Sequence, residues 1–151
     1  PLIIAGTSID DDKKFEKYRK VKSIQFLGKV SQKIKISLLQ LCHAVILPST
    51  GRNEAFGISL LEGLRYGKPL ISTDLQTGTS EVNKHMVSGL VIKPRSIDAI
   101  CDAMDKFMND DDLYLKLSEG AVKHYNDKFS HNQMTNSYFR IYQELLNSKN
   151  A

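Results

Sequence analysis

The sequence predicts an α/β domain in which a doubly wound parallel sheet is followed by C-terminal helices. Short apolar runs alternate with longer segments of helical period along the 151 residues. The apolar runs have no polar alternate face, which is typical of strands that are buried on both sides. Helices between such strands supply the right-handed crossovers of a parallel sheet. With 41% hydrophobic and 25% charged residues, the composition fits one compact domain over residues 1–151 and excludes disordered and fibrous classes.

Five short apolar runs are expected to form the strands. Each is bounded by Gly, Pro, Ser or charged residues, which are common in turns. The expected strands are Leu2–Ala5, Ile24–Leu27, Ala44–Leu47, Leu70–Ser72 and Leu90–Ile92. Lys68 and Pro69 are expected to form the turn that leads into the fourth strand.

Helices are expected where a capping residue precedes a stripe of apolar side chains. Ser31 is placed to cap one helix, whose apolar face carries Ile34, Leu38 and Leu41. Ser96 is placed to cap another, which runs to about Asn109 and whose apolar face carries Ile97, Ile100, Met104 and Phe107. Both helices therefore have a side that can pack on the sheet.

No strand is expected after Ile92, and the chain ends in further helices. One spans about Asp111 to Asp127, and a C-terminal helix occupies residues 130–148. Ser130 and Gln133 fit a capping box at the start of this last helix. Its apolar stripe consists of Met134, Tyr138, Ile141 and Leu145. The stripe needs a partner surface, either on this domain or on another part of the protein, and packing is favoured over membrane contact.

Charge is unevenly distributed, although the net charge is only +4. Residues 13–35 carry nine basic side chains against Glu16 alone, whereas residues 98–127 carry eight acidic side chains against three basic ones. Such a basic segment is either a solvated helix face or a surface that attracts anionic lipid headgroups or phosphorylated ligands. Nucleic acid is disfavoured as a partner, because no aromatic residues are interleaved with the basic ones in a stacking pattern.

The cellular setting follows from what the chain lacks. The longest apolar runs fall far short of the roughly 20 residues that span a bilayer, so no transmembrane helix is expected. The first residues have no basic leader or cleavage site and read as a strand entered midway, which predicts a piece of a longer protein. Cys42 and Cys101 lie in apolar, helix-like surroundings, which favours buried free thiols over a disulfide. The prediction is a cytoplasmic protein that can attach peripherally to the inner face of the membrane.

The junction after the third expected strand carries the candidate site. In open parallel α/β sheets, ligands bind outside the carboxyl ends of the strands. The loop at this junction leads into a helix that starts near Gly57, and Glu54 and Glu62 flank that start. The unpaired amides of residues 56–59 can receive a phosphate oxygen, and the Glu62 carboxylate can accept hydrogen bonds from two ribose hydroxyls. Glu54 would meet hydroxyls beyond the phosphates, so the arrangement predicts a nucleoside diphosphate joined to a sugar.

The segment Glu54-Ala55-Phe56-Gly57-Ile58-Ser59-Leu60-Leu61-Glu62 resembles the E-x7-E motif of retaining glycosyltransferase family four, also called group 1 glycosyltransferases. Further matches follow the family's order along most of the chain, at residues 2–6, 26–30, 47–49, 62–71, 81–82 and 89–91. The resemblance implies a Rossmann-like fold, as the C-terminal, donor-binding half of a two-domain GT-B enzyme. It also implies a retaining, hexosyltransferase-type reaction, in which a UDP- or GDP-linked sugar passes to a glycan or lipid-linked acceptor in surface polysaccharide synthesis.

The resemblance assigns roles to individual residues. Glu54 matches the acid that holds hydroxyls of the transferred sugar, and it is the catalytic candidate. Glu62 matches the ribose ligand, and Gly28 to Val30 match the loop beside the nucleobase. The full set of donor-binding candidates is Glu54, Phe56, Gly57, Ile58, Ser59, Glu62, Gly28, Val30, Ser49 and Glu81. Glu81 is equally consistent with a place in the site and a place on the surface.

Two parts of the family's site have no match in this sequence. The Gly-Arg element and following Lys that clamp the diphosphate would precede Pro1, and the N-terminal acceptor-binding domain is absent as well. The sequence therefore predicts that the 151-residue chain folds, binds nucleotide weakly and does not turn over.

No cofactor and no essential metal are expected. The resemblance implies that backbone amides, a helix dipole and cationic side chains stabilise the leaving diphosphate. The acidic runs Asp10–Asp12 and Asp110–Asp112 fall where helices begin, which favours capping over a metal site. The four histidines are scattered and form no ligand set or catalytic triad; they are His43, His85, His124 and His131.

Two other functions fit parts of the pattern. A GT-B nucleotide-sugar epimerase would share these motifs, but it would interconvert the free donor without an acceptor. A non-catalytic α/β module, such as a receiver-like domain, would need a phosphorylatable Asp at a strand end, where Gly28 and Pro48 stand instead.

Overall fold

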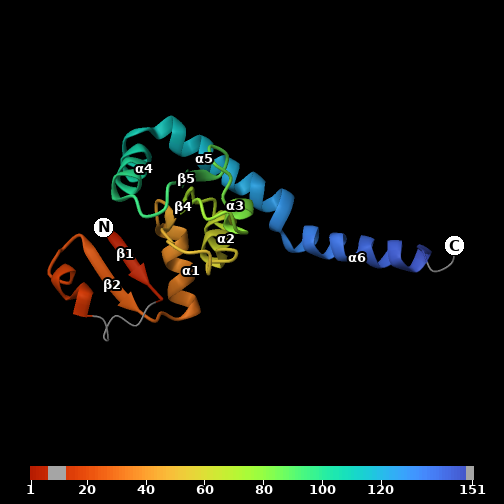
Figure 1. The fold of residues 1–151 in the computed structure, drawn as a ribbon, viewed down its shortest axis with the longest axis horizontal. Coiled ribbons are helices and arrows are strands. Elements are labelled where there is room, and N and C mark those ends of the chain that lie inside the picture. Colours follow the sequence, from red (N-terminus) through yellow and green to blue (C-terminus); the bar gives the residue numbers. More distant parts are fainter. Residues whose placement is uncertain (7–12, 149–151) are drawn as a thin grey trace. The chain divides into compact units, whose positions relative to one another are not determined.

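The structure, a computed structural model, describes residues 1–6 and 13–148. The chain divides into two compact units, Pro1–Leu41 and Cys42–Ala151. Each unit contains its own parallel sheet, with two strands in the first unit and three in the second (Figure 1). The predicted α/β class with parallel sheets and C-terminal helices is confirmed. The run Asp10–Asp12, which was expected to cap a helix, lies outside the described residues.

The first unit is built on two parallel strands, β1 (Leu2–Ala5) and β2 (Ile24–Gly28). The short 3-10 helix η1 (Lys13–Tyr18) lies between them in the chain. Its Phe15 ring packs on the ring of Phe26 in β2, with the centroids 5.9 Å apart. This aromatic contact ties the connection to the sheet.

Helix α1 (Gln32–Leu41) closes the first unit. The Ser31 hydroxyl oxygen accepts a 3.3 Å hydrogen bond from the backbone N–H of Ile34, which confirms the predicted cap. Leu41 is the last residue of the helix and is 85% exposed. Ile34, in the first turn of the same helix, is 48% exposed. The predicted packing of these two side chains, near the two ends of α1, is therefore wrong.

The second unit contains a parallel sheet in the order β3-β4-β5. Its strands are β3 (Val45–Leu47), β4 (Leu70–Thr73) and β5 (Gly89–Ile92). Its helical segments are α2 (Ile58–Arg65), α3 (Thr79–Val82), α4 (Ile97–Asn109), α5 (Asp111–His124), the π-helix η2 (Tyr125–Phe129) and α6 (His131–Ser148). All five strands predicted for the chain are therefore present, with ends that differ by no more than one residue.

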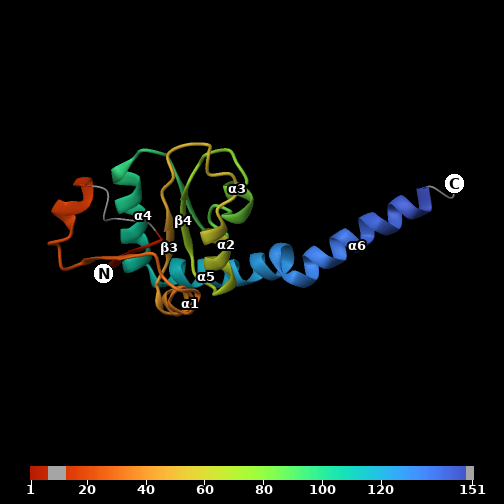
Figure 2. The same cartoon turned by 90° about the horizontal axis from the view of Figure 1, so that it is seen from below.

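The core of the second unit has two parts, one on each face of the sheet. Strand β4 is buried along its whole length, and alternation sends Leu70 and Ile71 to opposite faces. The cluster around Leu70 is formed with Leu60, Leu64, Val82 and Ala121. The cluster around Ile71 is formed with Leu90, Ala103, Phe107 and Leu117. Figure 2 shows α2 and α4 on opposite sides of β3 and β4, which is the doubly wound arrangement.

Local signals locate the helix ends of the second unit well. The Ser96 hydroxyl oxygen accepts a 3.2 Å hydrogen bond from the Ala99 N–H, and Asp110 Oδ1 accepts a 2.9 Å bond from the Leu113 N–H. Both predicted caps are confirmed, and the run at Asp110 is a helix start. Ile97 lies in the first turn of α4 and is 79% exposed, so its predicted packing is wrong.

The turn before β4 is also as predicted. Gly67 adopts a positive φ of 65°, and the backbone N–H of Lys68 donates a 3.0 Å hydrogen bond to the Gly63 carbonyl. This pattern ends α2 in a left-handed C-terminal cap. Lys68 and Pro69 then lead directly into β4.

The π-helix η2 separates α5 from α6, where the sequence predicts one helix up to about Asp127. The Ser130 hydroxyl oxygen accepts a 3.4 Å hydrogen bond from the Gln133 N–H, which confirms the Ser130 half of the capping box. The predicted apolar stripe is exposed, at 55% for Met134, 59% for Tyr138, 48% for Ile141 and 57% for Leu145. The stripe was expected to pack either on this domain or on another part of the protein. Packing on this domain is therefore wrong.

The two cysteines differ in their surroundings. Cys42 is half-buried and Cys101 is exposed, and neither forms a disulfide. The predicted burial of Cys101 is wrong because its position on α4 faces away from the cluster of Ala103 and Phe107. Burial raises the pKa of the Cys42 thiol, and the nearby charge of Lys68 partly opposes that shift. Within the described residues, no helix combines the length and the apolar character needed to cross a membrane.

Candidate functional site

The candidate site is built on the β3–α2 loop, residues 48–57, at the carboxyl end of the sheet of the second unit. Glu54 is half-buried in this loop. Its Oε1 atom accepts a 3.0 Å hydrogen bond from the backbone N–H of Gly57, the residue that caps helix α2. The carboxylate therefore lies against the positive end of the helix, where an anion is stabilised.

Gly57 makes this turn possible. Its backbone is left-handed, with φ 83° and ψ 61°, a conformation that other residues adopt at a cost. A Cβ atom at this position would lie 2.9 Å from Leu60 Cδ1 and 3.2 Å from Leu47 Cδ2. The glycine thus lets the loop turn into α2 while strand β3 and the helix stay packed together.

Helix α2 carries three more of the predicted donor contacts, Ile58, Ser59 and Glu62. Ile58 and Ser59 are exposed in its first turn, where backbone amides have no intrahelical acceptor. Glu62 is half-buried in the second turn, and helical side chains lean toward the N-terminus. The predicted helix start near Gly57 is confirmed, and Glu54 and Glu62 lie on the loop and the helix as expected.

A second loop, the β4–α3 loop of residues 74–78, is tied to the first. The Thr77 hydroxyl donates a 2.9 Å hydrogen bond to the main-chain carbonyl of Glu54. The Thr73 hydroxyl at the end of β4 donates to the Ser49 carbonyl, and Arg52 Nη2 lies 3.5 Å from the Gln76 carbonyl oxygen that it contacts. These contacts join the two loops along most of their length.

Four further predicted residues, Glu81, Phe56, Gly28 and Val30, have different places in the structure. Glu81 is in α3, but its carboxylate forms a 3.0 Å ion pair with Lys84 and is 71% exposed. Phe56 is half-buried, and its ring meets that of Phe129 edge-on with centroids 6.1 Å apart. Gly28 and Val30 belong to the first compact unit, Pro1–Leu41, whereas Glu54 belongs to the second.

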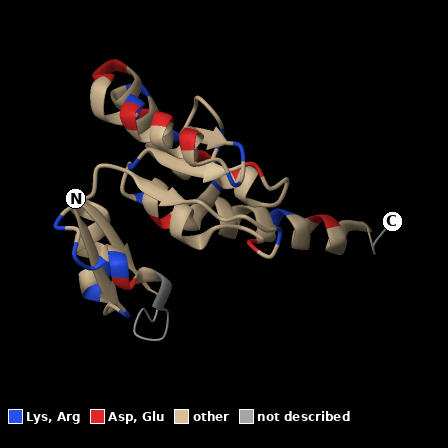
Figure 3. Ribbon diagram, turned by 60° about the vertical axis from the view of Figure 1, so that its left-hand side comes forward, with Lys and Arg blue, Asp and Glu red and all other residues tan. Residues whose placement is uncertain are grey.

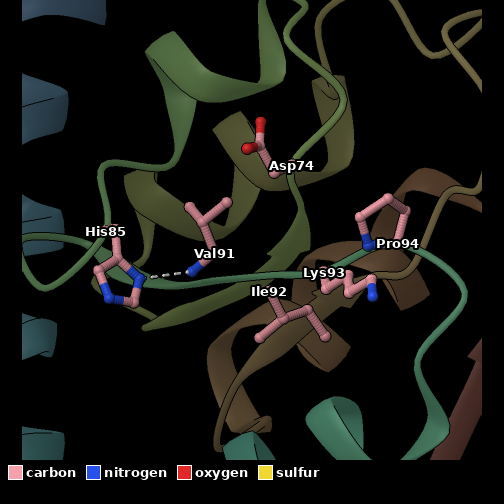
Figure 4. Close-up of a pocket in the computed structure, with 6 residues that line it drawn as sticks. All are labelled: Asp74, His85, Val91, Ile92, Lys93 and Pro94. Atoms are coloured by element: carbon pink, nitrogen blue, oxygen red, sulfur yellow. Dashed lines mark hydrogen bonds between the residues drawn. The ribbon is translucent and has the colours of Figure 1, made fainter.

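A shallow depression of about 440 Å³ lies beside the candidate loops, at the carboxyl ends of β4 and β5 (Figure 4). It is lined by Asp74, His85, Val91, Ile92, Lys93 and Pro94. None of these residues was predicted to bind a ligand. His85 is oriented by a 3.0 Å hydrogen bond that its Nδ1 atom accepts from the backbone N–H of Val91.

The described residues contain no group of three side chains suited to hold a metal ion. His43 stacks on the ring of Tyr114 and contacts the Phe107 carbonyl at 2.8 Å. His124 contacts the Glu81 carbonyl at 2.8 Å. These histidines have structural roles, as the sequence predicts.

Sequence reasoning missed Thr77 and Arg52 as parts of this site. Their contacts join segments that are more than 20 residues apart, and no local periodicity or cap reveals such contacts. The one available signal was the small-residue run 77–80, which follows β4 after three residues and marks a tight turn at the carboxyl edge of the sheet.

Comparison with known proteins places the chain in a family. Residues 1–124 match the family described as "Glycosyl transferases group 1". The chain is 36% identical over 149 residues to the O-antigen chain mannosyltransferase C of Escherichia coli, covering 98% of this chain and 40% of that protein. It is 50% identical over 84 residues to the D-rhamnosyltransferase WbpZ of Pseudomonas aeruginosa, covering 56% of this chain and 22% of that protein.

Solved structures show the same fold. A glycosyltransferase from Rickettsia africae superposes with a TM-score of 0.78 at 26% identity, over 95% of this chain and 39% of that one. Anabaena HepE, solved with UDP-glucose, superposes with a TM-score of 0.78 at 18% identity, over 94% of this chain and 40% of that one. The chain thus spans two fifths or less of the length of these relatives. With its family match, its relatives and its GT-B fold, the chain belongs to the group 1 glycosyltransferases.

Proposed function

We propose that this chain is the donor-binding half of a retaining, GT-B glycosyltransferase of family four. In this proposal a hexose-type sugar passes from a nucleoside diphosphate to a glycan or glycolipid acceptor, with retention at the anomeric carbon. The observation that carries the proposal is the start of α2, where Glu54, the Gly57 amide and Glu62 follow one another along one loop and helix. Support also comes from the names of the relatives, which transfer mannose and rhamnose.

Each residue has a defined role in this proposal. Glu62 accepts hydrogen bonds from the ribose hydroxyls, and the first-turn amides of Ile58 and Ser59 face the diphosphate. Glu54 is the catalytic candidate, because its carboxylate holds hydroxyls of the sugar whose bond to phosphate breaks. That bond's electrons leave with the diphosphate, and the acceptor oxygen forms the new bond to the anomeric carbon. The proton of the acceptor hydroxyl passes to the departing diphosphate. Catalysis then consists of positioning and charge stabilisation, without an essential metal or a covalent nucleophile in this chain.

The proposal assigns donor binding to this chain and acceptor binding to another part of a longer protein. The chain spans 40% of the Escherichia coli mannosyltransferase that it resembles. The structure of a C-terminal domain of a group 1 glycosyltransferase from Francisella tularensis superposes on 79% of this chain with a TM-score of 0.66. Both comparisons support a donor-binding domain that needs an acceptor domain and further diphosphate contacts for turnover. The 151-residue chain alone is therefore expected to bind nucleotide weakly and to be inactive.

The nucleotide and the setting form part of the proposal. The expected donor carries UDP or GDP, and Gly28 and Val30 are expected to lie beside its nucleobase. HepE was solved with UDP-glucose, which supports a nucleotide-sugar donor. A role in surface polysaccharide synthesis would place the enzyme in the cytoplasm, at the inner face of the membrane. The exposed basic side chains Lys17, Lys20 and Lys22 of the first unit are suited to that anionic surface. Figure 3 shows several Lys or Arg positions, in blue, on the unit that contains the N-terminus.

Ligand-observed NMR tests the proposal directly. The chain is mixed with UDP, GDP, ADP, UDP-glucose and GDP-mannose, and saturation transfer to each is measured for wild type, Glu62→Gln and Glu119→Gln. Glu119 is an exposed acid on α5 and serves as the matched control. We expect selective saturation of one nucleoside diphosphate that is lost in Glu62→Gln and kept in Glu119→Gln. Binding that survives Glu62→Gln unchanged would show that the nucleotide lies elsewhere.

A further inference from the structure

We propose that Thr77 is a positioning residue for Glu54, and that it governs binding of the sugar half of the donor rather than the nucleotide half. This inference rests on the proposed function, because it assigns Glu54 to the sugar and Glu62 to the ribose. It adds a residue from the β4–α3 loop, which the fold brings into contact with the β3–α2 loop that carries Glu54.

The contact itself is well defined. Thr77 is half-buried, and its hydroxyl donates a 2.9 Å hydrogen bond to the Glu54 carbonyl. The hydroxyl oxygen of Thr79, a residue that is 2% exposed, lies 3.1 Å from that of Thr77. A threonine hydroxyl has one proton, and Thr77 uses its proton on Glu54, so Thr79 must be the donor between the two threonines. The result is a directed relay from Thr79 through Thr77 to Glu54.

Backbone packing holds the two loops at a fixed separation. A Cβ atom on Gly78 would lie 2.7 Å from the Ala55 carbonyl oxygen and 2.8 Å from Phe56 Cδ2. The main chains of residues 55 and 78 are therefore in direct contact, with no room for a side chain between them. The loop that carries Glu54 can move away from Thr77 only if this contact is also lost.

Glu54 is consequently held both by its backbone carbonyl and by its side-chain carboxylate. Its carbonyl accepts from Thr77, and its carboxylate accepts from the Gly57 N–H at 3.0 Å. Fixing both points restricts the direction in which the carboxylate can meet a sugar hydroxyl, and such restriction is what positioning contributes to a site. Glu62 is placed by the backbone of helix α2, which contains neither of these hydrogen bonds.

Thr77→Val and Thr77→Ser separate the hydroxyl from the shape of the side chain. Valine keeps the branched shape and removes the donor, whereas serine keeps the donor and removes one methyl group. Thr135→Val is the matched control, because Thr135 is exposed on α6. Thermal unfolding of all four proteins first establishes that each variant is folded.

The first measurement needs no ligand. The amide resonance of Gly57 and its rate of hydrogen exchange report whether the Glu54 carboxylate still accepts from it. We expect Thr77→Val to shift this resonance and to speed exchange, and we expect Thr77→Ser and Thr135→Val to leave both unchanged. A Gly57 amide that is unchanged in Thr77→Val would overturn the inference whatever the ligand does.

The second measurement compares the affinity for a nucleoside diphosphate with that for its sugar conjugate, using UDP with UDP-glucose and GDP with GDP-mannose. We expect Thr77→Val to reduce the gain from the sugar by about tenfold, as for one lost hydrogen bond, with diphosphate affinity within about twofold of wild type. Thr77→Ser should restore the gain. Equal losses for both ligands, no loss, or no rescue by serine would overturn the inference alone. A wild-type chain that binds neither diphosphate would overturn the proposed function and this inference with it.

Discussion

The carboxylate of Glu54 accepts a 3.0 Å hydrogen bond from the backbone N–H of Gly57, at the N-terminus of helix α2. One acid thus has two roles, because it caps the helix and is also the candidate that meets the sugar. Mutation of Glu54 will change both roles unless the substitution separates them. The choice of substitution therefore decides what an activity assay on the longer enzyme would report.

Glu54→Gln and Glu54→Ala should differ in stability. Glutamine keeps an oxygen that can accept from Gly57, whereas alanine leaves the amide without this partner. We expect Glu54→Ala to lower the free energy of unfolding by about 1 kcal/mol, as for a lost helix cap, and Glu54→Gln to lower it by less. Urea unfolding followed by circular dichroism measures the difference. Equal losses in the two variants would mean that the hydrogen bond contributes nothing.

Gly57→Ala should be more disruptive than its size suggests. The new methyl group would meet Leu60 and Leu47 at 2.9 and 3.2 Å, and the backbone has a positive φ of 83°. We expect a loss of about 2 kcal/mol or more in the free energy of unfolding. Gly51→Ala in the same loop is the control, because its methyl group would meet only the flexible end of Asn53. The prediction fails if the two variants unfold at the same urea concentration.

Thiol alkylation should distinguish the two cysteines and reveal the influence of Lys68. Burial raises the pKa of Cys42, so less of its thiol is ionised at mildly alkaline pH and its alkylation is slower than that of exposed Cys101. Its rate should keep rising with pH beyond the range in which an ordinary thiol ionises. Lys68→Met removes the charge that lowers this pKa, and it should slow Cys42 further. Mass spectrometry of iodoacetamide-treated Cys42→Ser and Cys101→Ser proteins resolves both rates.

Asn83 should be a hot spot for stability. It is 1% exposed at the end of α3, and its Nδ2 atom donates to Ser72 Oγ at 2.8 Å and to the Leu90 carbonyl at 3.2 Å. Its side chain thereby joins β4 to β5. Asn83→Ala removes both of these buried hydrogen bonds, and we expect a loss of about 2 kcal/mol. Asn109→Ala removes an exposed side-chain bond and should cost less than about 0.5 kcal/mol in the same urea titration.

Much of the fold could be predicted from sequence because its signals are local. Strand ends follow from short apolar runs, and the caps at Ser31, Ser96 and Asp110 follow from residue type and position. The Glu54 loop and the start of α2 were also predictable from a local signal, since Gly57 lies three residues after the acid that caps its helix.

The remaining features depend on packing between distant segments. Thr77 and Glu54 are brought together by the neighbouring strands β3 and β4, and no pattern around either residue encodes their hydrogen bond. The exposure of Cys101 and Ile97 depends on the angle at which α4 meets the sheet, which periodicity leaves open. The π-helix η2 interrupts a helical pattern that gives no sign of a break.

The hydrogen bond between His85 and Val91 occupies a backbone group at the edge of the second sheet. Strand β5 is an outer strand, and an outward N–H such as that of Val91 is a template for pairing with a strand from another molecule. The His85 ring accepts from that N–H, and the Met86 N–H donates to the Gly89 carbonyl at 2.8 Å on the same strand. Two groups that would otherwise recruit a foreign strand are thus already occupied, which protects the unit against edge-to-edge aggregation.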